Sequence, residues 1–461
     1  MDELFPVEPV QPPSPTRRRL FVVVTLILVA AFVVVAGLEG SGFVVRTGPP
    51  PTPEATTAPA TPARLAYVDL DGALDVMDAS SQSILHVPST GVTFGFPAWS
   101  PDGSRLAAIR SDVGGTGLDV FAFADGGGTA VASPTPTTVY ASADQPVFYL
   151  YWAPDSQALA FLTTVPDGLA LRLAPADVAG AARVVRNGSP MYWQWLEPTR
   201  LLVHVGGDDP AAFAGEVGLD GQPVGSSVID SGSFRAPARS NDGRYQAFTT
   251  PGRDGGASVV VLATGGSGRH DVPVNGAAAF EFEPAGDTLA FTAADRPTDT
   301  ANIPIGPLRA IDPASGAVRT LIDGSVVAFF WAPDGKTIAA ISVPQPGDTK
   351  TAADDHAITL ARVTPRTRQA EAGVQLRLSF VDVATGTFRS VADIRLSDLF
   401  INQVLPYFDQ YALSHRFWSP DSRSIVLPVD NDRGITRLTT FFAAGSDPVE
   451  IADGQFASWS P

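Results

Sequence analysis

Beyond residue 63 the chain consists of short runs in which apolar and polar positions alternate. Residues 105–109 (RLAAI), 118–125 (LDVFAFAD) and 376–391 (LRLSFVDVATGTFRSV) are examples, and turn-forming residues stand between such runs. Alternation with a period of two is typical of a β-strand that buries one face. The pattern therefore predicts an all-β fold made of many short strands.

One motif recurs in this pattern: an aromatic residue, a Pro-Asp turn and a second apolar strand. Its clear copies begin at Trp99 (WSPDGSRLA), Trp152 (WAPDSQALA), Trp331 (WAPDGKTIA) and Trp418 (WSPDSRSIV). Weaker copies begin at Trp195, Arg239 and Phe282, and the sequence ends on Trp459-Ser460-Pro461. Most intervals between these anchor residues are in the low forties, which is the length of one four-stranded propeller blade. The sequence predicts a β-propeller of eight four-stranded blades, with a count of seven left open.

The two ends of the chain are predicted to build one blade together. Residues 456–461 supply only the first strand of a repeat, whereas residues 64–86 begin at the second strand. Pairing these ends would remove the exposed edge strands that an open array of repeats leaves. We therefore expect residues 64–461 to form a propeller closed by strand pairing between its N- and C-terminal ends.

The repeat W-[SA]-P-D-[GS]-x-x-[LI]-A resembles the TolB-type propeller repeat, which also occurs in propellers attached to prolyl oligopeptidases. The resemblance covers about residues 64–461 and implies a fold rather than an activity. The sequence contains no G-x-S-x-G nucleophile elbow of the kind that the peptidase domain carries. No catalytic residue is therefore carried over from these families.

The N-terminal part of the chain has the pattern of a membrane anchor. Residues 20–38 carry no charge, and at about 1.5 Å per residue a helix of this length spans a hydrocarbon core of roughly 30 Å. Arg17, Arg18 and Arg19 precede it, so the positive-inside rule places residues 1–19 in the cytoplasm as a disordered tail. A cleaved signal peptide is the alternative, since Ala36 and Gly37 could form a cleavage site.

Residues 39–63 are rich in Pro, Thr and Ala and are expected to form a stalk between membrane and propeller. The predicted protein is thus a single-pass protein of the cell membrane, held there by residues 20–38, with its propeller outside the cytoplasm. We expect it to be a monomer.

Composition removes several classes of function. The formal net charge of −17 would repel a phosphate backbone, so nucleic acid is not expected as a partner. The chain has no cysteine, which excludes disulfides, thiolate metal ligands and cysteine nucleophiles. Its five histidines are scattered without ligand spacing, and two acidic stretches, 69–75 and 430–432, fit hairpin turns better than calcium loops. No metal, cofactor or catalytic residue is predicted.

Two insertions, at residues 343–374 and 395–415, are predicted on the face that carries the loops between blades. The second concentrates aromatic and polar side chains suited to a protein or small-molecule partner. They are Phe400, Gln403, Tyr407, Phe408, Asp409, Gln410, Tyr411, His415 and Arg416. The candidate binding residues are Tyr407, Asp409, Tyr411, His415 and Arg416. The alternative is a short helix, capped by Ser397 and ending near Pro406, that packs its aromatics over the blade ends.

A second set of aromatics precedes the anchors, at the start of the strands that would line the central channel. They either fill the core or bind a ligand, and core filling is the interpretation we favour. The set is Phe96, Tyr149, Tyr192, Phe280, Phe329 and Phe456.

Together these patterns predict a non-enzymatic binding or scaffold module held outside the membrane. Two alternatives remain: an enzyme of hydrolase, lyase or cyclase type built from the loop-rich face, and a sensor ectodomain that signals through the single helix. Binding and catalysis are distinguished by the loop-rich face, because catalysis would require convergent carboxylates or a His–carboxylate pair there.

Overall fold

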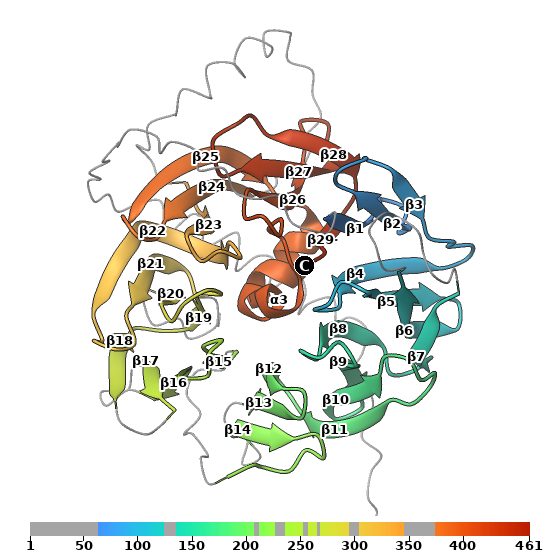
Figure 1. Ribbon diagram of the computed structural model, residues 1–461, viewed down its shortest axis with the longest axis horizontal. Coiled ribbons are helices and arrows are strands. Elements are labelled where there is room, and N and C mark those ends of the chain that lie inside the picture. The colour runs from blue at the N-terminus through green and yellow to red at the C-terminus, as the bar shows by residue number, and fades with distance from the viewer. Residues whose placement is uncertain are drawn as a thin grey trace, which may run out of the picture. The chain divides into compact units, whose positions relative to one another are not determined.

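Antiparallel β-sheets make up nearly all the regular structure in the computed structural model (Figure 1). The structure describes residues 63–123, 135–206, 212–225, 236–251, 257–264, 268–294, 304–344 and 374–461. All of them belong to one compact unit. In every sheet neighbouring strands follow one another along the chain, except that the last strand, β29 (Phe456–Trp459), pairs with the first, β1 (Arg64–Val68), and the predicted all-β propeller class is confirmed.

The first three sheets each have four strands. One has the order β29 (Phe456–Trp459), β1 (Arg64–Val68), β2 (Leu74–Asp78) and β3 (Ile84–His86). The next contains β4 (Thr93–Trp99), β5 (Arg105–Asp112), β6 (Gly115–Ala122) and β7 (Thr137–Ser142). The third contains β8 (Val147–Trp152), β9 (Ala158–Val165), β10 (Gly168–Pro175) and β11 (Arg183–Gly188).

The middle of the chain forms two further sheets. A three-stranded sheet contains β12 (Met191–Glu197), β13 (Arg200–Val205) and β14 (Phe213–Gly218). A four-stranded sheet contains β15 (Ala238–Arg239), β16 (Tyr245–Pro251), β17 (Ala257–Ala263) and β18 (Arg269–Val274).

The last two sheets differ from the simple four-stranded pattern. A seven-stranded sheet contains β19 (Ala278–Phe282), β20 (Leu289–Ala293), β21 (Gly306–Ile311), β22 (Val318–Trp331), β23 (Thr337–Ser342), β24 (Gln375–Asp382) and β25 (Thr387–Arg395). The long strand β22 pairs with β21 through its first half and with β23 through its second, so it joins two meanders. The final sheet contains β26 (Ser424–Asp430), β27 (Thr436–Phe442) and β28 (Val449–Asp453).

In the copies of the motif that contain it, the aspartate holds the turn that follows the anchor. Asp102 Oδ1 accepts hydrogen bonds from Ser100 Oγ at 2.6 Å and from the backbone N–H of Ser104 at 3.0 Å. Gly103 follows with a φ of 70°, a conformation that glycine adopts without a steric penalty. These interactions explain why Pro-Asp-Gly recurs between the first and second strands of a repeat.

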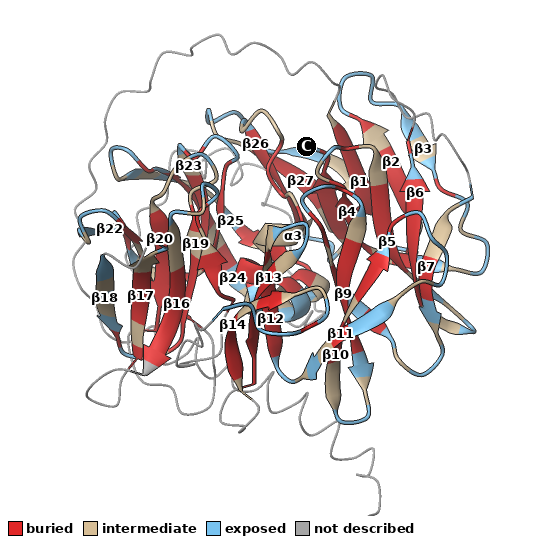
Figure 2. Cartoon of the chain, turned by 60° about the horizontal axis from the view of Figure 1, so that its bottom comes forward, coloured by how far each residue is buried: buried red, intermediate tan, exposed pale blue. Residues whose placement is uncertain are grey.

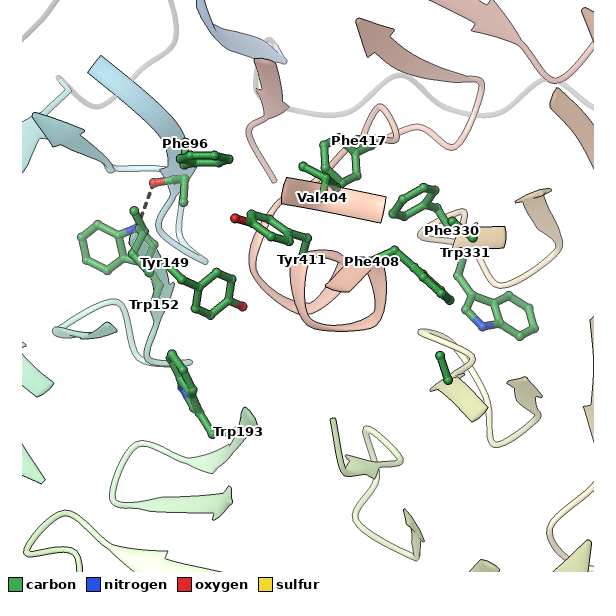
Figure 3. Close-up of a cluster of buried hydrophobic side chains, with 14 of the residues drawn as sticks. Phe96, Tyr149, Trp152, Trp193, Phe330, Trp331, Val404, Phe408, Tyr411 and Phe417 are labelled. Atoms are coloured by element: carbon green, nitrogen blue, oxygen red, sulfur yellow. Dashed lines mark hydrogen bonds between the residues drawn. The ribbon is translucent and has the colours of Figure 1, made fainter. Parts of the chain in front are cut away.

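The tryptophans of the motif join neighbouring repeats. In five of the six anchor tryptophans the indole N–H donates to the backbone carbonyl of the residue that precedes the anchor in the adjoining repeat, whereas the indole N–H of Trp459 has no partner among the described residues; Figure 3 shows Trp152 in the bonded position. The pairs are Trp152 with Ala98 (2.9 Å), Trp195 with Tyr151 (3.3 Å), Trp331 with Glu281 (3.2 Å), Trp418 with Phe330 (3.0 Å) and Trp99 with Ser458 (3.2 Å). Because phenylalanine has no such donor, the motif gains an inter-repeat hydrogen bond from tryptophan in particular.

Strands β1 and β29, from opposite ends of the propeller sequence, form one antiparallel ladder. The backbone N–H of Ser460 donates to the Arg64 carbonyl at 2.8 Å, and Ser460 Oγ accepts from the Arg64 backbone N–H at 3.0 Å. The Arg64 guanidinium lies 5.1 Å from the ring centres of both Trp99 and Phe123. Cation–π contacts of this kind strengthen when they are desolvated, and Arg64 is only 5% exposed.

Most residues of the inner strands are buried, whereas the outer strands and the turns carry most of the exposed residues (Figure 2). The largest core cluster runs through several sheets and contains Phe161, Trp193 and Phe329, none of which is exposed. Since there is no disulfide, this packing and the strand ladders are what hold the described residues together.

No helix within the described ranges is long and apolar enough to span a membrane. The expected tail, span and stalk at residues 1–62 lie outside the described residues, as does most of the expected insertion at 343–374. These remain predictions.

Candidate functional site

The second expected insertion folds into a continuous helical segment. It contains a π-helical turn η2 (Phe400–Val404), a 3₁₀ turn η3 (Leu405–Tyr407) and the helix α3 (Phe408–Ser414). Ser397 caps its start, since Ser397 Oγ accepts the backbone N–H of Phe400 at 3.2 Å, as predicted. The predicted end near Pro406 is wrong. Proline lies at the start of η3, where a helical turn needs no N–H from it, and the helix continues to Ser414.

This segment, residues 397–415, occupies the centre of the arrangement of sheets, and we call it the plug. Helix α3 contacts strands β8, β12, β19 and β22, which belong to three different sheets. Figure 1 shows α3 surrounded by the inner strands. The insertion therefore extends inward between the sheets rather than lying over their ends.

Aromatic side chains fix the plug to the inner strands on opposite sides (Figure 3). Phe408, which is fully buried, packs edge-on against Phe329 with ring centres 5.1 Å apart. Tyr411 packs against Tyr149 at 5.2 Å and against Phe96 at 5.7 Å. Aromatic pairs in this geometry add about 0.5–1.5 kcal/mol each beyond area burial. The aromatics that precede the anchors thus fill the core, as favoured from the sequence.

Gln410 is the main polar link between the plug and the sheets. Its Oε1 accepts the backbone N–H of Trp193 at 3.0 Å, and its Nε2 donates to the Trp193 carbonyl at 2.8 Å. Tyr149 Oη donates to the Gln410 carbonyl at 2.7 Å. The side chain completes the pairing of an inner strand as another strand would, so it fixes the position of α3.

Replacing Gln410 with leucine should destabilise the protein by about 2 kcal/mol or more, because the buried N–H and carbonyl of Trp193 would lose their partners. Urea unfolding followed by tryptophan fluorescence measures this. Gln403→Leu is the matched control, since Gln403 is exposed and its loss should change stability little. Equal effects of the two substitutions would contradict the role assigned to Gln410.

The structure places the five predicted binding residues very differently from one another. Asp409, Tyr411 and His415 are 2–5% exposed, and Arg416 is partly buried. Only Tyr407 is well exposed, at 49%. The five side chains do not share one exposed surface, because the plug inserts most of them between the sheets. Their role in binding stays a prediction.

His415 is held as a neutral ring in this core. Its Nε2 lies 3.3 Å from the Phe96 carbonyl and its Nδ1 lies 2.7 Å from Ser414 Oγ, so Nε2 carries the proton. Burial lowers the pKa of His415 to about 4, an effect that the Phe96 carbonyl partly opposes. An uncharged imidazole packs between Tyr411 and Phe456 without a charge to desolvate.

Four ionisable side chains, of which the sequence had singled out only Asp409 and Arg416, come from the plug, from the residue that follows it and from the inner strands. They are Tyr151 on β8, Glu281 on β19, Asp409 on α3 and Arg416 after α3, and we call them the axial polar cluster. Burial, and then the charge of Asp409, raises the pKa of Glu281 to about 8. Glu281 and Tyr151 each occupy the position just before an anchor residue, where other repeats carry Ala98 or Phe330.

Glu281 should make stability depend on pH. Its folded-state pKa lies above its ordinary value of 4.5, so the folded state favours the protonated carboxyl. The contribution of Glu281 to the free energy of unfolding is therefore fully present below about pH 4.5 and is lost as the pH rises to 8. Glu281→Gln should therefore match the parent protein at pH 4.5 and exceed its free energy of unfolding at pH 9 by on the order of a few kcal/mol. Urea titrations across this range measure the difference, and parallel pH profiles of the two proteins would contradict it.

Within the described ranges no group of three His, Cys, Asp or Glu side chains could hold a metal ion. The acidic stretches fit turns instead. Asp69 Oδ1 accepts the backbone N–H groups of Asp71 and Ala73, and Asp430 Oδ1 accepts the Thr436 hydroxyl at 2.7 Å.

Comparison with known proteins bears on the fold alone. No family model matches the chain, and no curated protein matches it. Among solved structures, dihydro-heme d1 dehydrogenase NirN in complex with DHE aligns with a TM-score of 0.51 and 14% identity, over 88% of this chain and 76% of that one. An identity this low indicates a shared fold and does not carry an activity across.

Two other solved structures align with lower TM-scores. Putative TolB from Agrobacterium tumefaciens aligns at a TM-score of 0.32 and 15% identity, over 72% of this chain and 90% of that one. An oligogalacturonate lyase in complex with manganese aligns at 0.43 and 13%, over 84% and 83%. The sheets of the described residues form a β-propeller, with a helical plug among its inner strands.

Proposed function

We propose that this protein is a membrane-tethered propeller that binds a protein or small-molecule partner outside the cytoplasm and catalyses no reaction. The observation that carries the proposal is the plug. Phe400, Phe408 and Tyr411 are buried between the inner strands, so the plug occupies this space with its own side chains and presents Asn402, Gln403 and Tyr407 at its surface. Such a surface suits recognition better than chemistry on a substrate.

We further propose that the propeller has eight four-stranded blades and is closed by its own C-terminal strand. The ladder between β29 and β1 supports closure, as does the hydrogen bond from Trp99 to the Ser458 carbonyl. The two meanders that share β22 support a count of eight rather than seven. A closed ring leaves no unpaired inner edge and gives the tether a rigid body to present.

Tyr407 is the residue of the plug best placed to meet a partner. Its ring is half exposed and packs 6.1 Å from the buried ring of Tyr192 on β12. An aromatic side chain that is already held in place loses little conformational entropy on binding, which is a property of interface hot spots. The acidic chain favours partners that are neutral or cationic.

The test is retention of partners from native membranes by the full-length protein in detergent. The parent protein should retain a defined partner, and Tyr407→Ala should lose it with the fold intact. Arg423→Ala is the control, because Arg423 is exposed in the turn after Trp418, away from the plug. Identical retention by all three proteins, or turnover of a substrate by the parent, would overturn the proposal.

Tethering is tested separately by fractionation. An uncleaved anchor at residues 20–38 should leave the full-length protein in the membrane pellet after alkaline extraction. Recovery of a soluble extracytoplasmic form without residues 1–36 would replace the anchor by a signal peptide and leave the binding proposal standing.

A further inference from the structure

The two ends of the plug are fixed to the last strands of the chain, whereas its middle is held through side chains. The backbone N–H of Ser397 donates to the Pro428 carbonyl on β26 at 3.0 Å, and the N–H of Trp459 on β29 donates to the Arg416 carbonyl at 2.8 Å. Strands β26 and β29 contact each other. Between these two points no residue of the plug belongs to a β-ladder. The plug can therefore leave the centre of the fold without breaking a sheet.

His415 joins the end of the plug to two of the sheets. Its Nε2 lies 3.3 Å from the Phe96 carbonyl on β4, and its ring lies 5.2 Å from the ring of Phe456 on β29 and 5.4 Å from that of Tyr411 on α3. The residue is only 2% exposed. One titratable ring thus connects the plug, β4 and β29 at a place that solvent does not reach.

The backbone of Phe96 is strained at this contact. Its φ is 50°, in the left-handed region that bulky side chains rarely adopt, and a β-bulge interrupts the β4–β5 ladder between Gly95 and Ala98. In this conformation the Phe96 carbonyl accepts the proton of His415 Nε2. Strain of this kind occurs at segments that switch between two states. Departure of the plug would allow Phe96 to relax.

The surroundings of His415 suit a neutral ring and not a charged one. Among the described residues no carboxylate contacts it, and the adjacent Arg416 is itself a cation. Aromatic rings offset only part of the hydration that a buried cation loses, and burial accordingly lowers the pKa of His415 to about 4. The groups that face the ring are the Tyr149 ring from β8, the Tyr411 ring and the Ser414 hydroxyl from α3, the Phe456 ring from β29 and the Phe96 carbonyl from β4.

We propose that the plug is an acid-sensitive latch: when His415 takes up a proton, residues 398–415 leave the centre of the fold while the sheets stay folded. The proton binds Nδ1, and water then solvates the cationic ring in the released segment. This latch goes beyond the proposed function, since it is a property of the protein without a partner.

The sign of the pH dependence follows from the two states of His415. In the released segment the imidazole regains its ordinary pKa of 6.5, whereas in the docked plug its pKa is about 4. The neutral ring therefore stabilises docking fully above about pH 6.5, and this contribution is lost as the pH falls to 4. Over that range the released population should increase about tenfold per pH unit.

The carboxyl groups beside the plug act in the opposite direction. Burial and the charge of Asp409 on α3 raise the pKa of Glu281 on β19 to about 8. Acid removes the repulsion between these two groups and so strengthens docking. A release that increases below pH 6.5 therefore cannot come from this pair, which makes the acid response specific to His415.

The experiment uses a single engineered cysteine as a probe, because the chain has none. Val404→Cys places a thiol at a fully buried position of η2, and Val259→Cys places one at a fully buried position of β17 to report unfolding of the sheets. Each full-length protein in detergent reacts with dithiodipyridine, and the rate is divided by that of free cysteine at the same pH. From pH 6.5 to 4.5 the normalised rate should rise about thirtyfold at Val404→Cys and stay level at Val259→Cys.

His415→Gln tests the residue itself, because the amide can still donate to the Phe96 carbonyl but does not titrate. In this background the reactivity of Val404→Cys should no longer rise in acid, whatever its level at pH 7. His86→Gln is the matched control, since 76% of the His86 side chain is exposed, and it should keep the full acid response.

Three results would overturn the latch: no acid rise at Val404→Cys, an equal rise at Val259→Cys, or a rise that persists in His415→Gln. The second would mean that acid unfolds the sheets together with the plug. Partner retention through Tyr407 at pH 7 is unaffected by any of these outcomes, so the latch and the proposed function fail separately.

Discussion

Replacing Phe408 with alanine is expected to lower the free energy of unfolding by about 3–5 kcal/mol, the usual cost of truncating a buried phenylalanine. The ring is fully buried and packs against Phe329 at 5.1 Å and Phe330 at 6.1 Å between ring centres. Its loss would leave a cavity where the plug meets β22, which the surrounding sheets cannot close without breaking their ladders. Urea unfolding followed by circular dichroism measures the change.

The matched control is Phe148→Ala, since Phe148 on β8 is 38% exposed and makes no comparable contact with the plug. Its effect should stay below about 1.5 kcal/mol because most of the lost surface is already in contact with water. A Phe408→Ala protein as stable as Phe148→Ala would mean that residues 397–415 do not pack at the centre of the fold.

The second large effect is expected at the contact between the two ends of the propeller. Trp99→Ala should destabilise the protein by about 3–5 kcal/mol, because it removes a buried ring, the hydrogen bond to the Ser458 carbonyl and one of the two rings beneath Arg64. Trp99→Phe keeps a ring but loses the donor, and it should cost about 1–2 kcal/mol. Thermal and urea unfolding of the two variants give the comparison.

The order of these effects matters more than their size. Val113→Ala, at a fully exposed position in the β5–β6 turn, should be neutral within about 0.5 kcal/mol. If Trp99→Phe were also neutral, the indole would not join the repeats by a hydrogen bond, and the explanation for tryptophan at the anchor positions would fail.

The strands and their turns could be predicted from the sequence because local rules decide them. Trp99, Trp152 and Trp331 each end a strand, and each is followed by a turn in which aspartate accepts the local N–H groups. Alternation, proline and glycine act over a few residues, so no tertiary information is needed. The capping role of Ser397 was predictable for the same reason.

The position of the plug could not be predicted in this way. The composition of residues 395–415 fits both an exposed aromatic surface and a buried helix, and only contacts with distant strands decide between them. Gln410 shows this, since its partners Trp193 and Tyr149 are remote in sequence. Tyr407 and Tyr411 are alike in type and lie on the same segment, yet one is 49% exposed and the other 5%.

The axial polar cluster left one signal in the sequence. Glu281 interrupts an otherwise apolar strand, AAFEF, at the position before the anchor that Ala98 and Phe330 occupy in other repeats. A charged residue there should have indicated an unusual environment near the axis. Its electrostatic interaction with Asp409 and Tyr151 could not be read from the sequence, since it depends on how the repeats are arranged about the centre.

The central claim, a propeller closed by its own two ends, can be tested directly because the chain has no cysteine of its own. Tyr67 and Ala457 are partners across the β1–β29 ladder, and both are nearly fully buried. In the full-length Tyr67→Cys/Ala457→Cys protein, we predict that mild oxidation forms an intramolecular disulfide, detected by mass spectrometry, because paired strand positions meet the distance that a disulfide requires. Folded protein in which both thiols stay free under these conditions would contradict closure through β29.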